Sequence, residues 1–419
     1  MTPGRIASAM PAQRRMHVLM ISDVYFPRIN GVSTSMLTFR DTLERLGVRV
    51  TIVAPDYPGT DRAADAAEGI LRLPSRAVPL DPEDRLMHWR PLARLDRRLA
   101  SANFCDIDLV HVQTPFAAHY AGLRLARARG IPCIATYHTH FEEYLFHYIR
   151  FLPRGALRYA SRSLARQQCD SLDAIVVPSP PMAATLLGYG VAAPLHVIAT
   201  GLPESQFLRG DGQRYRRQWA IAPERKLALF VGRVAHEKNI GFLLHMLAVA
   251  RRQRPELMLL IAGEGPAAAA LRRQAAALGI EDHVRFVGYL PRESGLRDCY
   301  AAADVFTFAS LTETQGLVLL EALASGLPVL AIASLGAAEI VSPERGAMPA
   351  AATPEAFAGQ LNALLNQPAK LRVMAAEAIA FAREWDAAAQ GARLAALYRQ
   401  LLCAAVAAAA PAPAVALGQ

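Results

Sequence analysis

The feature that most constrains the fold of this chain is an alternation of short apolar segments with amphipathic ones. Segments rich in β-branched residues recur on both sides of residue 205, from HVLMISD at 17–23 to PVLAIA at 328–333. Stretches with helical periodicity separate them, and strands that alternate with helices form parallel sheets covered on both faces. Because the strands are too numerous for one open sheet, the sequence predicts an α/β protein with two Rossmann-like, doubly wound parallel-sheet domains.

Changes in composition suggest where these domains begin and end. The segment TGLPESQFLRGDGQRYRRQW, at 200–219, is polar and rich in glycine and charge, so we place the domain break near residue 205. The predicted order is a flexible basic leader at 1–15, a first domain at 16–205, a second domain at 206–385, a closing helix at 386–400 and a disordered Ala/Pro-rich tail at 401–419.

Charge and cysteine content limit the functional classes. The net charge of +9 favours an acidic partner such as a phosphorylated ligand, an anionic membrane or a nucleic acid. The five cysteines are scattered and form no C-x-x-C pair, which indicates neither a zinc site nor a disulfide framework. The chain also lacks an ordinary membrane-spanning segment. A reducing cytoplasm is the predicted compartment.

Most of the predicted strands end in a small or polar group. In open α/β sheets, ligands bind beyond the carboxyl ends of the strands. The polar groups are therefore expected to line two facing rims, with the binding site in the cleft between the domains. They include Asp23, His138, Ser179, Thr200, Arg233 and Ser310.

Two loops after strands carry groups suited to phosphate. Arg233 and Lys238 flank the loop after the first strand of the second domain, where two cations would stabilise a leaving pyrophosphate without a metal. In the first domain, Asn30-Gly31 marks a turn, and Ser33 or Thr34 is expected to cap the helix that follows. Alternatively, Arg233 and Lys238 are solvated loop charges, and Asn30-Gly31 is a plain strand-to-helix turn.

The segment LTETQGLVLLEALASG, at 311–326, holds two carboxylates eight residues apart. The sequence predicts a loop that ends near Gly316 and a helix that stops at Gly326. Glu313 would then lie at the helix mouth, beside the N–H groups of residues 315–317. Glu321 lies among apolar residues, where a charge is costly to bury without a partner or ligand, so we expect it to face a bound hydroxyl pair.

Two further motifs bear on metals and ligands. The sequence Asp106-Ile107-Asp108 has a D-x-D spacing, but it introduces a strand, so capping of the strand entry is the favoured reading. With no other carboxylate or histidine cluster, the sequence predicts that neither a metal nor a cofactor is required. His138 lies at a strand end, where it is either a structural histidine or a ligand to a sugar hydroxyl or a phosphate.

Together these features resemble the retaining glycosyltransferases of family 4, which have the GT-B fold. The resemblance covers roughly residues 16–400, and its most specific element is the pair Glu313 and Glu321 within ETQGLVLLEALASGLPVLA. It implies that Glu313 and the N–H groups of Gln315, Gly316 and Leu317 hold the sugar of a nucleotide-sugar donor. It also implies that Glu321 holds the ribose.

The resemblance implies roles for the remaining candidates. Arg233 and Lys238 would hold the pyrophosphate, and His138 would touch the transferred sugar. The remaining donor contacts would come from backbone groups of Gly31, Gly288 and Tyr289. The acceptor would attack from the leaving group's own face, so that configuration is retained and no protein base is needed.

The ETQG form of the motif, at 313–316, differs from the EGFG of many family members and is similar to that of diacylglycerol glucosyltransferases. We therefore expect hexose transfer from UDP-glucose to a membrane lipid such as diacylglycerol, with GDP-mannose and a glycan or glycolipid acceptor as the alternative.

Two other classes of protein are less favoured. A phosphorylase-like enzyme would often need a pyridoxal-bearing lysine in a chain poor in lysine, and a nucleic-acid-binding protein would not need the glutamate pair.

A run of arginines spaced by four suggests contact with a membrane. Between residues 144 and 168 there are five arginines and no acidic residue, and aromatic residues precede them. On a helix this spacing keeps the cations on one face, which suits an anionic membrane surface; the alternative is a solvated helix face. We expect peripheral association with the inner face of the cell membrane through Arg150, Arg154, Arg158, Arg162, Arg166 and Trp89.

Overall fold

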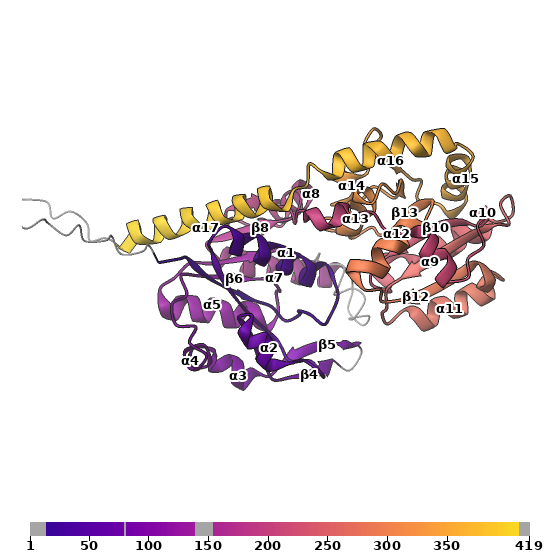
Figure 1. The fold of residues 1–419 in the computed structure, drawn as a ribbon. Helices are drawn as coiled ribbons and strands as arrows, with labels where there is room; N and C mark the ends of the chain where they lie inside the picture. Colours follow the sequence, from indigo (N-terminus) through magenta and orange to yellow (C-terminus); the bar gives the residue numbers. More distant parts are fainter. Residues whose placement is uncertain (1–13, 79–80, 139–153, 410–419) are drawn as a thin grey trace, which may run out of the picture.

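The computed structural model describes residues 14–78, 81–138 and 154–409 and contains two parallel sheets (Figure 1). The first sheet has seven strands in the order β3-β2-β1-β6-β7-β8-β9, and the second has six in the order β12-β11-β10-β13-β14-β15. The strands of the first sheet are β1 His17–Ile21, β2 Arg49–Pro55, β3 Ile70–Leu73, β6 Leu109–Val112, β7 Cys133–Thr136, β8 Ala174–Val177 and β9 Leu195–Val197. Those of the second are β10 Lys226–Val231, β11 Leu257–Ala262, β12 Val284–Gly288, β13 Val305–Phe308, β14 Val329–Ala331 and β15 Ala347–Pro349.

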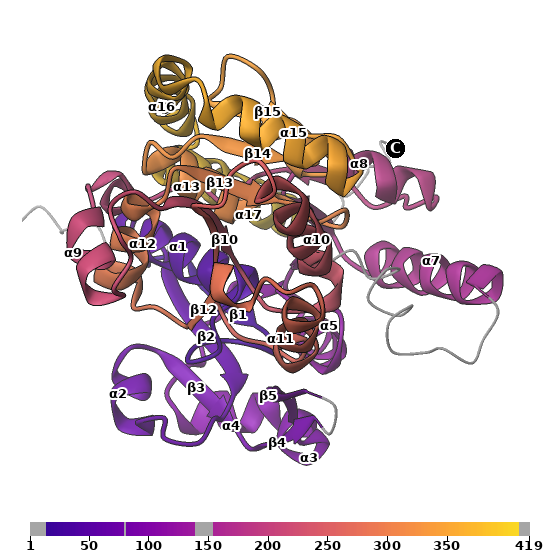
Figure 2. The same cartoon turned by 90° about the vertical axis from the view of Figure 1, so that its right-hand side faces the viewer.

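Helices cover both faces of each sheet, which confirms the predicted doubly wound architecture. In the second domain, α9 and α12 lie on one flank of the sheet and α10 and α11 on the other (Figure 2). The central strands are buried on both faces, so residues such as Leu229 and Leu259 are fully inaccessible to solvent. This double burial explains why the strands are continuous apolar runs rather than alternating ones.

The helices of the first domain are α1 Gly31–Arg45, α2 Arg62–Ala67, α3 Trp89–Ala93, α4 Leu95–Ser101, α5 Ala117–Arg129, α7 Arg154–Asp170 and α8 Pro180–Gly188. The later ones are α9 Gly212–Gln218, α10 Ile240–Ala250, α11 Ala268–Ala277, α12 Arg297–Ala302, α13 Leu317–Ala324, α14 Ala337–Ile340, α15 Pro354–Leu365, α16 Pro368–Ala382 and α17 Ala387–Ala409. A separate antiparallel hairpin, β4 Ser75–Val78 with β5 Asp81–Met87, extends from the first domain. Among the described helices, none has both the length and the apolar character that crossing a bilayer requires.

The chain passes between the two domains twice, and the two crossings touch. The N–H of Leu202 donates to the carbonyl of Trp385 at 2.6 Å, and the N–H of Ala387 donates to the carbonyl of Leu202 at 3.1 Å. A Cβ on Gly201 would lie 2.4 Å from the Cα of Ala387, so only glycine fits at this crossing.

Helix α17 returns from the second domain to pack on the first (Figure 1). Its buried Tyr398 donates or accepts a hydrogen bond of 2.7 Å with Nδ1 of His111 on β6. The prediction of a disordered tail from residue 401 is wrong for residues 401–409, which continue this helix. The reason is that alanine has the highest intrinsic helix propensity, so the alanine-rich sequence extends the helix beyond its packed part.

Candidate functional site

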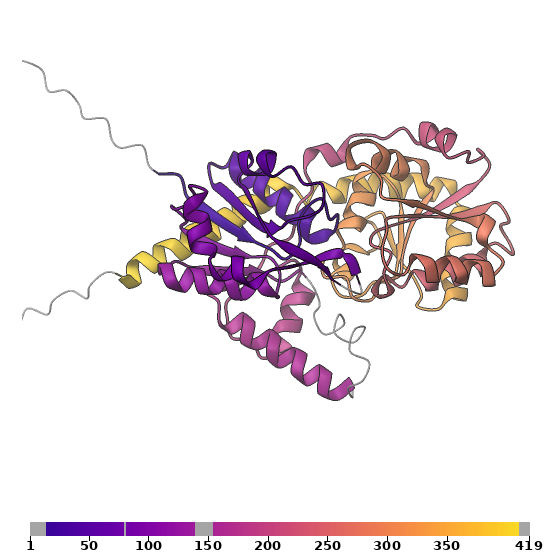
Figure 3. The same ribbon diagram turned by 90° about the horizontal axis from the view of Figure 1, so that it is seen from below.

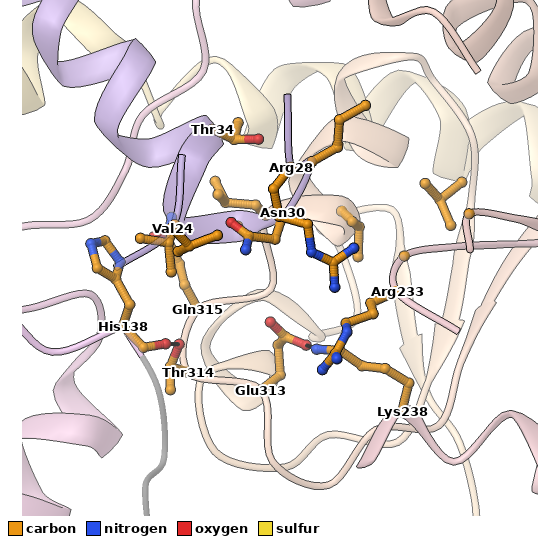
Figure 4. A pocket seen from close by; sticks show the side chains of 18 of the residues that line it. Val24, Arg28, Asn30, Thr34, His138, Arg233, Lys238, Glu313, Thr314 and Gln315 are labelled. Carbon is orange, nitrogen blue, oxygen red and sulfur yellow. Dashed lines mark hydrogen bonds and ion pairs between the residues drawn. The ribbon is translucent and has the colours of Figure 1, made fainter. Parts of the chain in front are cut away.

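The carboxyl ends of strands from both sheets face a cavity between the domains with a volume of about 540 Å³. Figure 4 shows side chains from both domains converging on this space. The residues predicted by sequence that line it are Gly31, His138, Arg233, Lys238, Tyr289, Glu313, Gln315, Gly316, Leu317 and Glu321. Among the described residues predicted to bind the donor, Gly288 does not line the cavity; its carbonyl accepts a hydrogen bond from the N–H of Gly263.

The loop after β10 brings its two cations to the cavity. Nζ of Lys238 lies 2.6 Å from Oε2 of Glu313, which makes a direct ion pair between the two predicted donor-binding loops. Arg233 contacts Glu237 at 3.4 Å, and its Nη2 lies 3.9 Å from Oδ2 of Asp84 in the β4–β5 hairpin. Burial lowers the pKa of Arg233, which indicates a poorly hydrated position where a bound anion would be strongly stabilised.

Glu313 lies just before helix α13, as the sequence predicts. Gly316 precedes the helix with a φ of 89°, a left-handed conformation that favours glycine. The first N–H groups of a helix have no partner within it, so the start of α13 adds donors beside the Glu313 carboxylate. A sugar hydroxyl or a phosphate oxygen at this point would meet an acceptor, a cation and backbone donors together.

Glu321 lines the cavity, but its carboxylate already has two protein partners. The guanidinium of Arg292 donates to Oε1, and the hydroxyl of Tyr300 donates to Oε2 at 3.1 Å. Glu321 is 4% exposed, and its carboxylate raises the pKa of Arg292. The buried charge therefore has protein partners of its own, and its carboxylate has lone pairs left for the ribose that the sequence predicts it to hold. Arg292 also donates to the hydroxyl of Thr34 in the first domain at 3.2 Å.

His138 is held beside the cavity by Gln113. Nε2 of His138 lies 2.9 Å from Oε1 of Gln113, and burial lowers the pKa of His138 to about 4. The imidazole is therefore neutral at pH 7, which suits a hydrogen bond to a sugar better than charge stabilisation of a phosphate. Its neighbours Thr139 and His140 lie outside the described residues.

The turn before α1 lines the cavity through Asn30 and Gly31. The cap of this helix is Asn30, whose side-chain oxygen accepts a hydrogen bond from the N–H of Ser33 at 2.8 Å. The prediction that Ser33 or Thr34 caps the helix is wrong, because the helix begins earlier, at Gly31. A Cβ on Gly31 would meet nothing within 4 Å, so the glycine leaves open space at the helix start.

Arg28 is a functional candidate that the sequence reasoning missed. Its side chain is 3% exposed and lines the cavity, where it donates to Glu83, to Asp84 and to the hydroxyl of Tyr289 across the cleft. The turn FPRING, at 26–31, gave no signal for this role, because the acidic partners come from a hairpin more than fifty residues away. Arg28 and Arg233 therefore face the acidic hairpin from both domains.

The D-x-D motif at residues 106–108 has a structural role at the entry to a strand, as the sequence favours. Asp108 accepts a hydrogen bond from the N–H of His17 at 2.8 Å and pairs with Arg14, which anchors the start of β1. Within the described ranges, no group of three or more histidine, cysteine, aspartate or glutamate side chains is arranged to hold a metal ion.

Helix α7 displays part of the predicted arginine run. Arg158, Arg162 and Arg166 are exposed, whereas the residues just before each of them, Leu157, Ser161 and Ala165, are buried. Arg162 stacks over the ring of Tyr189 at 5.1 Å, and Arg166 pairs with Asp170 at 3.4 Å, so these two cations also have intramolecular contacts. Figure 3 shows α7 projecting outward from the first domain.

The other predicted membrane residues are placed as follows. Arg150 lies outside the described residues, and Arg154 is the first residue of α7. Trp89 lies on α3, a different element from α7, and is 72% exposed.

Two parallel-sheet domains that face each other across a cleft lined by their strand ends define the GT-B class of glycosyltransferases. The family described as Glycosyltransferase Family 4 matches residues 29–206, and Glycosyl transferases group 1 matches residues 211–381. The chain is 35% identical to an alpha-monoglucosyldiacylglycerol synthase of Streptococcus pneumoniae over 327 residues, which are 75% of this chain and 71% of the relative. The chain thus belongs to glycosyltransferase family 4, and it is a hexosyltransferase of the retaining type.

Other similar proteins have different nucleotide sugars in their names. A GDP-mannose-dependent alpha-mannosyltransferase of Mycobacterium tuberculosis is 31% identical over 79% of this chain and 82% of its own length. The structure of Anabaena HepE, solved in complex with UDP-glucose, superposes with a TM-score of 0.74 at 17% identity, over 92% of this chain and 100% of that one. At that identity the likeness supports the fold.

Asp23 is a buried carboxyl group at the rim of the cavity. It accepts hydrogen bonds from the hydroxyl of Thr114 at 2.7 Å and from the N–H of Ala118, near the start of α5, at 3.1 Å. Burial raises its pKa from 3.8 to about 6, because desolvation outweighs these hydrogen bonds.

We expect this raised pKa to make stability depend on pH. The folded state binds the Asp23 proton more tightly than the unfolded state, so the associated stability is present below about pH 4 and is lost as pH rises through about 6. Relative to Asp23→Asn, the wild-type free energy of unfolding should fall by about 3 kcal/mol across this window, at 1.36 kcal/mol per pKa unit. Urea unfolding of both proteins at several pH values measures it, and a difference independent of pH would contradict it.

Proposed function

We propose that the protein transfers glucose from UDP-glucose to a membrane lipid such as diacylglycerol, with retention of configuration. The use of a nucleotide-sugar donor in this proposal rests on the 2.6 Å contact between Lys238 and Glu313 at the start of α13. The acceptor half is supported by relatives named alpha-monoglucosyldiacylglycerol synthase, from Streptococcus pneumoniae at 35% identity and Acholeplasma laidlawii at 28%.

The charges in the cleft support a mechanism. When the bond from glucose to diphosphate breaks, negative charge grows on the leaving phosphate, and Lys238, Arg233 and the N–H groups at the start of α13 stabilise it. Glu313 and neutral His138 hold sugar hydroxyls on either side. The acceptor hydroxyl attacks from the face of the departing phosphate, which takes its proton. In this proposal neither a metal nor a cofactor takes part.

GDP-mannose is the second candidate donor. The observation that favours it is the 31% identity to the mycobacterial mannosyltransferase, which extends over more of that relative than the match to the pneumococcal synthase does. Its acceptor would be a glycan or a glycolipid.

Radiolabelled donors distinguish these candidates. Purified protein is incubated with vesicles that contain diacylglycerol and with either UDP-glucose or GDP-mannose, and the organic extract is counted. We expect label in the lipid fraction from UDP-glucose, and none from a Glu313→Ala variant. Transfer from GDP-mannose alone would favour the second candidate, and water-soluble product alone would contradict the lipid acceptor.

We also propose that the arginine face of α7 holds the enzyme at the cytoplasmic face of an anionic membrane. Arg158, Arg162 and Arg166 are exposed on one side of the helix, and the nearby Tyr159 is 79% exposed. Each cation near an anionic surface contributes about 1 kcal/mol. Three of them would raise the partition coefficient by about a hundredfold.

Flotation with vesicles tests this surface. A triple Arg→Gln variant at 158, 162 and 166 should bind vesicles containing phosphatidylglycerol about a hundredfold more weakly than the wild type. The matched control carries the same charge change at exposed arginines of the later helices and the loop after α10, at 252, 273 and 372, and should bind like the wild type. Equal losses in the two variants, or equal wild-type binding to neutral vesicles, would contradict the proposal.

A further inference from the structure

Thr314 and Gln315, the middle of the ETQG segment, make hydrogen bonds across the cleft rather than into it. The side chain of Gln315 donates through Nε2 to the carbonyl of Thr200 at 2.7 Å and accepts through Oε1 from the N–H of Thr200 at 3.0 Å. One amide thus satisfies both backbone groups of a single residue in the other domain. Gln315 is 5% exposed and Thr200 is 3% exposed, so water competes little for these bonds.

Thr314 is bonded to the first domain through both its hydroxyl and its carbonyl. Its Oγ1 donates to the carbonyl of His138 at 2.7 Å, and its carbonyl accepts from the hydroxyl of Ser179 at 2.7 Å. Figure 4 shows Thr314 joined to His138, with Glu313 beside it. The partner residues His138, Ser179 and Thr200 follow β7, β8 and β9, which are neighbours in the first sheet.

The loop that contains Thr314 and Gln315 is also held by contacts within its own domain, the second one. The N–H of Gly336 donates to the carbonyl of Glu313 at 2.9 Å, and a Cβ at residue 336 would lie 2.1 Å from the carbonyl oxygen of Thr314. The loop is therefore confined between the strand ends of the first domain and Gly336 of the second. Glu313, which pairs with Lys238, is the residue immediately before the two that cross the cleft.

We propose that Thr314 and Gln315 are positioning residues that set the separation between Glu313 and His138 across the cleft. Four hydrogen bonds, three buried and one partly buried, tie the donor-binding loop to three adjacent strand ends, one of which carries His138. A displacement of about 1 Å in a catalytic group lowers the rate by about a hundredfold. This inference rests on the glycosyl transfer of the family and not on the proposed lipid acceptor.

The substitution Gln315→Glu tests the amide with almost no change in volume. The carboxylate still accepts from the N–H of Thr200, but it has no N–H for the Thr200 carbonyl and places one oxygen against another. We expect kcat to fall by ten- to a hundredfold, roughly as for a displaced catalytic group, with the donor KM nearly unchanged. A side chain that bound the donor directly would instead raise KM.

The chain contains a matched control in Gln360. Its Oε1 accepts from the N–H of Ala351 at 2.8 Å and its Nε2 donates to the carbonyl of Pro349, so it also bonds to backbone on both sides, but within the second domain. Gln360→Glu makes the same chemical change and should keep the wild-type kcat. The hydroxyl of residue 314 is tested by Thr314→Val, which should lower kcat, and by Thr314→Ser, which should restore it.

Small-angle X-ray scattering tests the inference without any substrate. Gln315→Glu should have a larger radius of gyration than the wild type and Gln360→Glu, because the domains are less firmly joined. If the wild type transfers neither glucose nor mannose, the proposed function fails and this measurement alone decides the inference. A kcat for Gln315→Glu within about threefold of the wild type, or, in an inactive protein, unchanged scattering, would overturn it.

Discussion

Replacing Lys238 by alanine is expected to lower kcat by about a hundred- to a thousandfold, the effect of losing one preorganised donor at a developing negative charge. The structure places its Nζ 2.6 Å from the Glu313 carboxylate and at the edge of the cavity, where a leaving diphosphate would lie between the two domains. The substitution also leaves Glu313 without its cation. Steady-state transfer with a saturating nucleotide sugar measures the change.

The control for this prediction is Lys370→Ala. Lys370 is exposed on α16, away from the residues that line the cavity, and its loss changes the net charge by the same amount. It should leave kcat unchanged. If Lys238→Ala retained a third or more of the wild-type kcat, Lys238 could not be the group that stabilises the leaving phosphate.

Replacing Arg292 by methionine is expected to lower the free energy of unfolding by about 3 kcal/mol, because it leaves the buried Glu321 carboxylate without its counter-ion. The side chain of Glu321 is 5% exposed and that of Arg292 is 31% exposed, so we take the lower end of the range known for broken buried pairs. Urea unfolding at pH 7 measures the effect.

A double variant isolates the cause of this loss. Arg292→Met combined with Glu321→Gln removes both charges and leaves the hydroxyl of Tyr300 with an acceptor. We expect it to recover most of the stability that the single substitution loses. If the double variant is less stable than Arg292→Met, the ion pair is not what holds this part of the second domain.

The arrangement of the candidate site was predicted in part from local sequence. Arg233 and Lys238 lie in the segment that follows β10, Glu313 lies in the loop that follows β13, and in a parallel sheet the strand ends lie along one edge. Their approach to a common cavity therefore follows from the alternation of strands and helices. The helix after Glu313 was also predictable, because Gly316 and Gly326 bound an apolar segment at helical spacing.

The partners of these groups could not be predicted in the same way. Arg292 reaches Glu321 from the start of a short helical turn, Arg292–Leu296, and Gln315 was expected to offer only its backbone. Its side chain instead meets Thr200, which lies 115 residues earlier in the chain. The first pair depends on packing within the second domain and the second pair on how the two domains are placed relative to each other, neither of which local propensity encodes.

The two doubly wound sheets and the strand ends that carry the site could be read from the residues alone, because buried parallel strands and their covering helices leave strong local patterns. The folded structure was needed to show which charges are neutralised, that Arg28 meets the acidic residues of the β4–β5 hairpin, that α17 packs on the first domain and that Thr314 and Gln315 bridge the cleft. These features arise from contacts between residues distant in sequence, within one domain or across the cleft, whose geometry exists only in the folded protein.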